Sequence, residues 1–275
     1  MLVSTPIGNL GDVSARARLA LSESDVVLCE DTRHSAGLLA GLGLSARLEA
    51  LHEHNEEARI PAVLGRLRAG GRVALISDAG TPLVSDPGFR LVRAAIAEGI
   101  EVTAIPGANA AVTALVVSGL PPLPFLVLGF PPPREAARRA AFGRLVAAER
   151  AGLSATLIWH EAPHRLAETL ADLAAAFGPR PAAVARELTK RFEETRRGPL
   201  DALAAHYATA PARGEITIVV APPDDVAPPD AEGLDARLRA AMRGNTLRDA
   251  AALVAAATGL PRRVVYARAL ELADG

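Results

Sequence analysis

The chain has 275 residues and a formal net charge of −1, with 50% hydrophobic and only 3% aromatic residues. This length can hold one large or two modest domains, with a core built mainly from Ala, Leu, Val and Ile. The near-neutral charge excludes a protein coated in positive charge. It does not exclude RNA binding, which depends on where the positive charge lies.

The single cysteine, Cys29, excludes an internal disulfide and fits a reducing compartment. No basic leader with an apolar core precedes the first expected strand, and no apolar run approaches the length of a membrane span. We therefore expect a soluble, cytoplasmic protein without a membrane partner. Lys190 is the only lysine, and we attribute this preference for arginine to genomic composition.

The first elements predict a β-loop-α-β start. Residues 2–5 form a short strand, residues 6–12 a loop, and Ser14 can cap a helix that leads into a buried strand at 26–29. The loop lacks GxGxxG, and the chain lacks GxxxxGK[ST]. Dinucleotide and nucleoside triphosphate binding are therefore disfavoured.

A dense polar segment, 30–34 (EDTRH), follows the carboxyl end of this second strand. Asp31 can orient a substrate hydroxyl, Arg33 can hold a phosphate and His34 can take a proton. The structural alternative is that the segment caps a helix over 35–41. Function and capping are compatible, and we expect the loop to face a substrate.

The segment 51–57 (LHEHNEE) precedes a helix that runs to about Ala69. Its two histidines suggest a metal, but a third ligand at a fixed spacing is absent, and so is HExxH. Acidic residues are also common at a helix start. We predict no metal and keep a substrate-contact hypothesis for His54 and Asn55.

The most informative loop is 77–88 (SDAGTPLVSDPG), between an apolar strand at 73–76 and a helix from Phe89. In open α/β sheets, ligands bind beyond the carboxyl ends of the strands. Asp78 and Asp86 suit ribose hydroxyls or a cation, and the glycines let a ligand approach the backbone. An ordinary surface turn is the alternative, but such a connection needs only a few residues.

A strand at 101–105 leads into a second candidate ligand loop, 106–110 (PGANA). A Pro-Gly turn before a helix of small residues brings free backbone amides close to a ligand. Tight packing of helix on sheet is the structural alternative. Because both loops follow strands of one sheet, we favour cofactor binding.

The Pro- and Gly-rich segment 118–124 (SGLPPLP) predicts a boundary between an N-terminal α/β domain, 1–118, and a C-terminal α/β domain, 119–222. The second domain is expected to contain strands at 125–130, 156–160, 182–185, 193–198 and 214–220. Residues 223–232 are a proline-rich linker, and 233–275 have the periodicity of a small helical module. His160 is either a half-buried histidine or a catalytic one.

The loop SDAGTPLVSDPG resembles the ligand loop of the tetrapyrrole methylase superfamily, in the form of its ribosomal RNA small subunit methyltransferase I branch. The segments TPIGNLGD, EDTR, HEHN, PGAN, EAPHR and ARELTK are similar to further motifs of that branch. The resemblance implies an α/β fold, with two α/β domains, a cofactor cleft between them and a helix-turn-helix-like C-terminal module. It also implies S-adenosylmethionine-dependent 2′-O-methylation of a cytidine in the decoding region of 16S rRNA, by a homodimer.

The resemblance further implies roles for individual residues. Cofactor contacts are expected from Pro6, Ser77, Asp78, Ala79, Gly80, Thr81, Val84, Pro106, Gly107, Asn109, Ala110 and Glu215. Contacts to rRNA in the small ribosomal subunit are expected from His34, His54, Asn55, Arg134, Arg138, Arg165, Arg186 and Lys190. We hypothesise that Asp31 orients or deprotonates the 2′-hydroxyl while Arg33 grips the neighbouring phosphate.

Two alternatives remain open from the sequence. A tetrapyrrole or diphthine-type methyltransferase can share the fold, since fold does not fix the substrate. A non-catalytic RNA-binding protein of ribosome assembly would bind RNA without any need for the cofactor. Signatures of a covalent nucleophile, such as GxSxG, are absent, which fits a reaction based on positioning.

Overall fold

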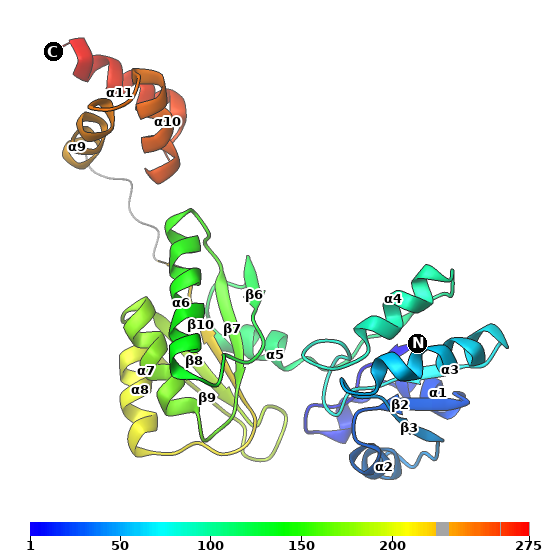
Figure 1. Cartoon of the computed structure of the whole chain (residues 1–275). Coiled ribbons are helices and arrows are strands. Elements are labelled where there is room, and N and C mark those ends of the chain that lie inside the picture. Colours follow the sequence, from blue (N-terminus) through cyan, green and yellow to red (C-terminus); the bar gives the residue numbers. More distant parts are fainter. Residues whose placement is uncertain (224–230, 259, 275) are drawn as a thin grey trace.

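The computed structural model describes residues 1–223, 231–258 and 260–274. These residues form two α/β units, each around a five-stranded sheet, and a module of three helices (Figure 1). The strand orders are β3-β2-β4-β1-β5 and β6-β7-β10-β8-β9. This architecture confirms the predicted fold class.

The first sheet is parallel throughout its described pairs. Its strands are β1 (Leu2–Val3), β2 (Val26–Cys29), β3 (Leu48–Ala50), β4 (Val73–Leu75) and β5 (Ala104–Ile105). Its helical elements are η1 (Leu10–Asp12), α1 (Ala15–Ser22), α2 (Thr32–Gly41), α3 (Glu56–Arg68) and α4 (Phe89–Ala97). Because parallel strands end at one edge, the loops that follow them are brought together there.

Buried apolar residues on both faces explain why β2 lies inside this sheet. All four residues of β2 are buried, and successive side chains point to opposite faces. Val27 packs in a cluster with Leu21 of α1 and Leu39 of α2. Leu28 packs in another cluster with Val63 of α3. Helices therefore cover both faces of the first sheet.

Helix α5 (Ala110–Ser118) follows the first sheet in the chain but packs on the second. Its buried Ala114 and Leu115 lie in one cluster with Ile158 and Val219. Small side chains allow this close approach, as the packing alternative for the PGANA segment anticipated. The boundary at residue 118 remains a prediction. Helix α5 precedes that boundary in the chain but packs on the second unit.

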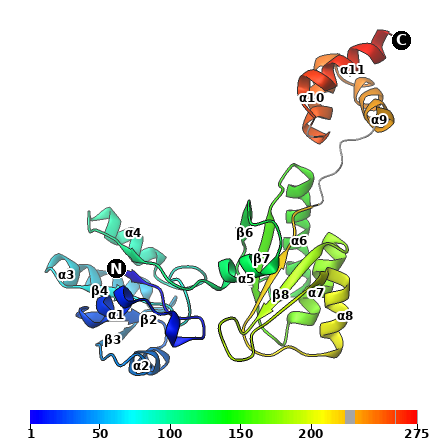
Figure 2. The ribbon, with the colours of Figure 1, turned by 180° about the vertical axis from the view of Figure 1, so that it is seen from behind.

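The second sheet is mixed: β6 pairs in parallel with β7, and the other pairs are antiparallel. Its strands are β6 (Phe125–Val127), β7 (Thr156–Glu161), β8 (Pro181–Arg186), β9 (Glu194–Pro199) and β10 (Ile216–Val220). Helices α6 (Glu135–Arg150), α7 (Leu166–Phe177) and α8 (Leu200–Thr209) cover the face opposite α5 (Figure 2). Phe142, Trp159 and Phe177 form the aromatic centre of this core.

The helical module contains α9 (Ala231–Met242), α10 (Leu247–Thr258) and α11 (Arg262–Asp274). Leu238, Val254 and Val265 give it a core of its own. Helix α9 begins two residues before the predicted start of the module at 233, and the remaining linker residues 224–230 lie outside the described residues. None of the described helices combines the length and apolarity that a membrane crossing requires.

Several predicted elements differ from the structure at their ends. The strands expected at 73–76 and 125–130 end early, at Leu75 of β4 and Val127 of β6, and the strand expected at 101–105 begins late, at Ala104 of β5. Helix α2 begins at Thr32 rather than at residue 35, because the Asp31 side chain caps it. The apolar residues beyond these strand ends therefore belong to the loops that shape the site.

Candidate functional site

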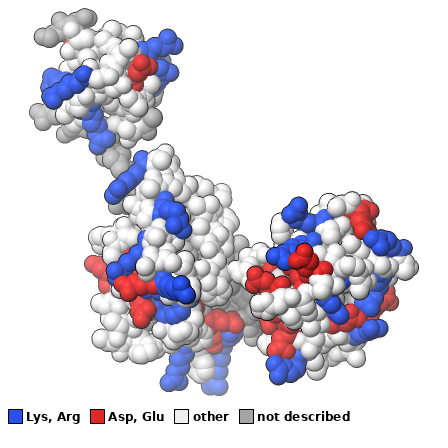
Figure 3. All heavy atoms as spheres, viewed as in Figure 1, with Lys and Arg blue, Asp and Glu red and all other residues white. Residues whose placement is uncertain are grey.

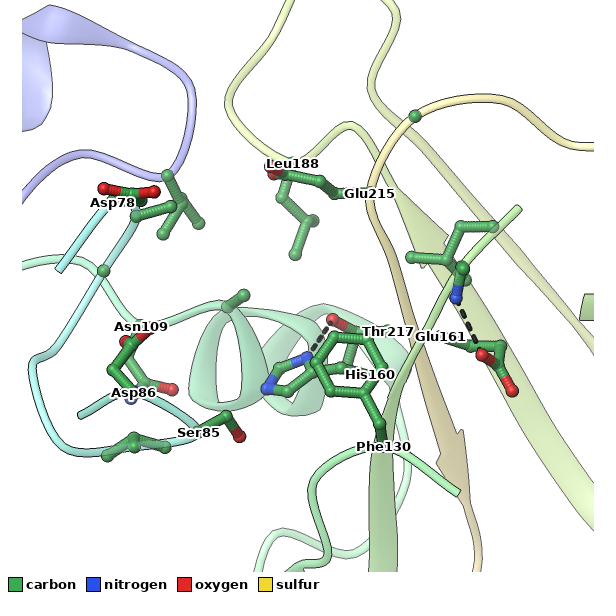
Figure 4. A pocket seen from close by; sticks show the side chains of 18 of the residues that line it. Asp78, Ser85, Asp86, Asn109, Phe130, His160, Glu161, Leu188, Glu215 and Thr217 are labelled. Carbon is green, nitrogen blue, oxygen red and sulfur yellow. Dashed lines mark hydrogen bonds between the residues drawn. The ribbon is translucent and has the colours of Figure 1, made fainter. Parts of the chain in front are cut away.

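A cavity of about 430 Å³ lies between the two α/β units (Figure 4). From the first unit it is lined by Ile7 and by loop 77–88, through Asp78, Ala79, Gly80, Thr81, Val84, Ser85 and Asp86. From α5 onward it is lined by Asn109, Ala110, Phe130, His160, Glu161, Ala162, Pro163, Leu188, Gly214, Glu215, Ile216 and Thr217. Volumes of this size are typical of small-molecule sites.

Hydrogen bonds to neighbouring loops hold loop 77–88 in place. Thr5 donates its backbone N–H to the Gly80 carbonyl at 2.9 Å and its hydroxyl to the Ser77 carbonyl at 3.1 Å. The Thr81 hydroxyl donates to the Ala108 carbonyl at 3.2 Å. The loops after β1, β4 and β5 therefore form one connected rim.

Backbone strain is concentrated beside this cavity. Among the described residues, every non-glycine residue with a left-handed φ lies in loop 77–88 or in the turn 187–190. These residues are Leu83 (72°), Ser85 (67°), Glu187 (51°) and Thr189 (65°). Such a conformation costs of order 1–3 kcal/mol and persists where the surrounding structure enforces it, often at functional sites.

Two carboxylates of loop 77–88 give the cavity negative character. Among the described residues, the buried Oδ1 atom of Asp78 has no hydrogen-bond partner. Burial, together with the negative charges of Glu30 and Asp78, raises the pKa of Asp86 to about 6. A buried acceptor without a partner costs roughly 1–3 kcal/mol, which a donor group on a ligand can recover. The site therefore suits a ligand that carries hydroxyls or positive charge.

The opposite wall comes from neighbouring strands of the second sheet. Thr217 of β10 pairs in register with His160 of β7, and its Oγ1 lies 3.3 Å from Nδ1 of the imidazole. Burial lowers the pKa of His160, so its ring is neutral near pH 7. The Phe130 ring lies 5.7 Å from the imidazole, measured between centroids. This wall is partly aromatic.

A buried ion pair supports that wall from behind. The Glu161 carboxylate accepts from the Ala162 amide at 2.8 Å and from the Thr169 hydroxyl at 2.5 Å. Arg165 lies 3.3 Å from the same carboxylate and donates to the Pro131 carbonyl at 2.7 Å. The pair therefore ties the loop after β6 to the loop after β7.

A second cavity, of about 490 Å³, adjoins the first. It is lined by Pro6, Ile7, Gly8, Leu10, Arg33, His34, Gly37, Leu38, Asp78, Ala79, Lys190 and Glu215. Ile7, Asp78, Ala79 and Glu215 line both cavities. The second cavity therefore contains the cationic side chains Arg33 and Lys190, and it shares one wall with the first cavity.

Most of the predicted cofactor residues come together at the first cavity. Of the twelve, the eight that line it are Asp78, Ala79, Gly80, Thr81, Val84, Asn109, Ala110 and Glu215. Pro6 lines the second cavity instead. Ser77 is buried and donates to the Gly80 carbonyl, and a Cβ on Gly107 would lie 2.7 Å from Cβ of Ser4. Ser77 and Gly107 therefore support the loops from outside the cavity lining, and Pro106 is also absent from that lining.

The residues predicted to contact the methyl acceptor also lie partly inside and partly outside a cavity lining. Arg33 and His34 line the second cavity, whereas Asp31 lines neither. The Asp31 carboxylate accepts from the amides of both residues and lies 3.3 Å from the Arg33 guanidinium. The hydrogen bonds to Arg33 lower the pKa of Asp31, which makes its carboxylate a weaker base. The capping alternative is therefore observed, and the catalytic role of Asp31 remains a prediction.

The HEHN segment lies away from both cavities. Asn55 accepts from the His52 amide at 2.9 Å and donates to the Ala50 carbonyl at 3.2 Å, so its side chain closes the turn after β3. His54 is exposed in that turn. Among the described residues, no group of three His, Cys, Asp or Glu side chains is arranged to hold a metal ion.

One predicted RNA contact is wrong. Arg138 is only 2% exposed and lies 2.7 Å from the equally buried Asp172. Phe142 follows Arg138 by one helical turn, so the two side chains lie on the same face of α6. Both are buried, so this face points to the core. The arginine-rich helix is therefore not a continuous phosphate track, although Arg134 at its start is exposed.

The other predicted RNA contacts in the second unit are ion-paired. Arg186 lies 2.6 Å from Glu194, and Arg165 pairs with Glu161. Lys190 pairs with Glu187 and Glu215 at the second cavity. Whether any of them contacts RNA remains a prediction.

The second-unit wall is what sequence reasoning largely missed. Ile216 and Thr217 line the cavity because β10 lies between β7 and β8, and Phe130 lines it from the loop after β6. The separate segments carry little signal of this, since β10 comes last in the sheet's sequence but lies in its centre. The available signal was Thr217, a polar residue in the otherwise apolar strand β10.

Comparisons with known proteins agree with this geometry. Residues 1–204 match the family model of tetrapyrrole (corrin/porphyrin) methylases, and residues 227–273 match the model of the RsmI C-terminal HTH domain. A solved structure of uroporphyrin-III C-methyltransferase from Thermus thermophilus, complexed with S-adenosyl homocysteine, has a TM-score of 0.52 at 18% identity. That match covers 80% of this chain and 95% of the other, and it shows the shared fold.

Curated relatives extend the match to nearly the whole chain. Ribosomal RNA small subunit methyltransferase I of Micromonospora olivasterospora is 48% identical over 96% of this chain and 84% of its own length. The protein of the same name from Mesorhizobium japonicum is 47% identical over 99% of this chain and 92% of its own. The chain therefore belongs to the ribosomal RNA small subunit methyltransferase I family, within the tetrapyrrole methylases.

Proposed function

We propose that the chain transfers a methyl group from S-adenosylmethionine to the ribose 2′-hydroxyl of a cytidine in 16S rRNA. The names of its relatives support rRNA of the small subunit as the substrate. The observation that carries the proposal is the pair of adjoining cavities with a common wall at Asp78 and Glu215. A donor in one and an acceptor in the other would meet at that wall.

The residues of the first cavity fit S-adenosylmethionine. Its ribose hydroxyls and its ammonium group are donors, and the unpartnered Oδ1 of Asp78 is an acceptor at the right place. The negative charge of Asp86 favours a ligand with positive charge. A related fold was solved in complex with S-adenosyl homocysteine, which supports the same ligand class.

When bound, the cofactor supplies an electrophilic methyl group on a sulfonium. The chain's own contribution is placement and exclusion of water. Asp78 and Asn109 hold the ligand from the rims of loops 77–88 and 106–110, and Phe130 and Leu188 exclude water from the other side. Backbone strain in loop 77–88 is the cost of presenting these groups together.

The second cavity fits an RNA acceptor. Arg33 has a side chain that is 91% exposed, and its guanidinium suits a phosphate. His34 lies beside it, one residue further along α2. On the face shown in Figure 3, basic side chains occur on all three parts of the chain, which suits an extended phosphate backbone.

We also propose that the chain acts in the cytoplasm, as a homodimer. Exposed apolar residues of α5 and of the segment after it support self-association: Val116 is 69% exposed and Leu123 is 77% exposed. Light scattering of the purified protein tests this part. A monomer at micromolar concentration would contradict it.

The experiment that tests the function is transfer of labelled methyl from S-adenosylmethionine. Unmodified 30S subunits, free 16S rRNA and a porphyrinogen are offered in parallel, and the products are digested for nucleoside analysis. We expect label in 2′-O-methylcytidine from one of the two RNA substrates. Label in the porphyrinogen alone, or in another nucleoside, would contradict the proposal.

A further inference from the structure

Three charged side chains meet at the boundary between the two cavities, two from the turn between β8 and β9 and one from the residue before β10. Lys190 Nζ lies 3.0 Å from Oε1 of Glu187 and 3.1 Å from Oε2 of Glu215. Lys190 lines the second cavity, and Glu215 lines both. The ammonium is therefore held at the boundary where a ligand in the first cavity and a ligand in the second cavity would meet.

The chain leaves room for these side chains at two glycines. A Cβ on Gly8 would collide with the methylenes of Lys190, and a Cβ on Gly214 would collide with the Glu187 carboxylate. Gly8 belongs to the first unit, so Lys190 reaches across from the second. Segments from three parts of the chain thus fix the position of the ammonium, which is more than a mobile surface ion pair requires.

The ammonium is charged and has a donor to spare. Burial alone lowers the pKa of Lys190, but hydrogen bonds to Glu187 and Glu215 outweigh burial and raise it above the ordinary value. An ammonium has three N–H donors, and among the described residues two acceptors engage it. The third donor can serve an oxygen in the second cavity. A fixed cation there stabilises negative charge as it develops on that oxygen.

We propose that Lys190 is a catalytic residue of the methyl transfer, donating a hydrogen bond to the acceptor hydroxyl oxygen while the Glu215 carboxylate takes its proton. This inference rests on the proposed function. In the step, the hydroxyl oxygen forms a bond to the methyl carbon, and the bond from that carbon to the donor sulfur breaks, leaving its electron pair on sulfur. The positive charge on the sulfur of the methyl donor and the negative charge on Glu215 are lost together, so charge balances.

The test compares Lys190→Met with Arg191→Met. Arg191 is the next residue, is exposed and lines neither cavity, so its variant loses the same charge outside the site. We expect Lys190→Met to lower kcat on the rRNA substrate by about 100-fold or more, as for loss of one oxyanion donor. KM for the RNA and calorimetric affinity for S-adenosylmethionine should stay within about threefold of wild type in both variants. Arg191→Met should keep the wild-type kcat.

Two results would overturn the role of Lys190. One is a kcat within threefold of wild type, and the other is a raised KM at unchanged kcat, which would make Lys190 a phosphate anchor. If Lys190→Met does not fold, Glu215→Gln decides, since its side chain is 67% exposed. At saturating S-adenosylmethionine it should lower kcat at least about tenfold, and a normal kcat would refute the proton transfer. A wild type that methylates no rRNA would refute the proposed function itself.

Discussion

Both α/β units place carboxylates at the same cavity, but those of the first unit are unpaired and those of the second unit are ion-paired. In the first unit, Asp78 and Asp86 form no ion pair with any described residue, and burial followed by the charges of Glu30 and Asp78 raises the pKa of Asp86. In the second unit, Glu161 pairs with Arg165 and Glu215 pairs with Lys190. Unpaired carboxylates reduce stability and are available to a ligand, whereas paired ones shape the wall. Toward the cofactor, the first unit therefore supplies unpaired binding groups, and the paired side chains of the second unit support the opposite wall.

The largest effect should follow from breaking the paired side. Arg165→Met leaves the fully buried Glu161 carboxylate without its cation, and we expect the free energy of unfolding to fall by about 3–5 kcal/mol. Cofactor affinity should fall as well, because Arg165 holds the loop that carries Phe130. Urea denaturation and calorimetry measure the two effects.

Arg138→Met is the matched control for that variant. It breaks a buried pair with Asp172, on the face of the sheet away from the cavity, although Asp172 keeps a second ion pair with Arg139. A loss of stability that is smaller than for Arg165→Met is expected, with cofactor affinity unchanged. If both variants weaken the cofactor equally, the loss is global and the Arg165 clamp has no specific role.

The next effect concerns the unpaired side. Asp78→Ala should weaken cofactor binding by about 10- to 150-fold, corresponding to about 1.5–3 kcal/mol for a hydrogen bond to a charged group. Stability of the ligand-free protein should not fall, because the buried Oδ1 has no partner to lose. Calorimetry and thermal unfolding check the two parts. Unaltered affinity would place the cofactor elsewhere.

A smaller effect concerns pH. Because the pKa of Asp86 is raised to about 6 in the folded chain, a cationic ligand should bind up to about tenfold more weakly at pH 5 than at pH 7.5. Asp86→Asn should abolish this dependence between the two pH values. A wild-type affinity that does not change with pH would separate Asp86 from the ligand.

The same shift has a consequence for stability. The folded chain binds the Asp86 proton more tightly than the unfolded chain, whose carboxyl has an ordinary pKa of 3.8. Ionised Asp86 therefore destabilises the fold above pH 6, and this penalty is relieved as pH falls from about 6 toward 4. Asp86→Asn should raise the free energy of unfolding at pH 7.5 by of order 1 kcal/mol, allowing for solvent screening.

The smallest effect is expected at Arg33. Its side chain is 91% exposed and its pairing with Asp31 is a surface contact. Arg33→Ala should leave the free energy of unfolding almost unchanged, while raising KM for the RNA. Steady-state kinetics with 30S subunits measure KM. An unchanged KM would remove Arg33 from the acceptor site.

The first unit was predictable from sequence because its ligand groups are contiguous. Loop 77–88 carries Asp78, Gly80 and Asp86 within one segment that directly follows an apolar strand. Parallel strands then bring such loops to one edge without any further information. Seven of the eight predicted cofactor residues that line the cavity come from these loops, and the eighth, Glu215, comes from the second unit.

The second unit was less predictable because its contributions depend on pairing. Nothing local places Thr217 beside His160; the register of β10 against β7 does so. Charge was also a poor guide, since Arg138 and Arg134 look alike in sequence but one is buried against Asp172. Distinguishing them required the position of the core-facing Phe142 on the same helix.

The most direct test of this comparison is a crystal structure with S-adenosylhomocysteine. We predict that the ligand lies in the cavity between the two sheets, with a donor group on Oδ1 of Asp78 and an apolar contact to Phe130. The second cavity, with Arg33 and Lys190, should remain open for the acceptor. A ligand that occupies the second cavity, or that makes no contact with Asp78, would contradict the division of roles between the two units.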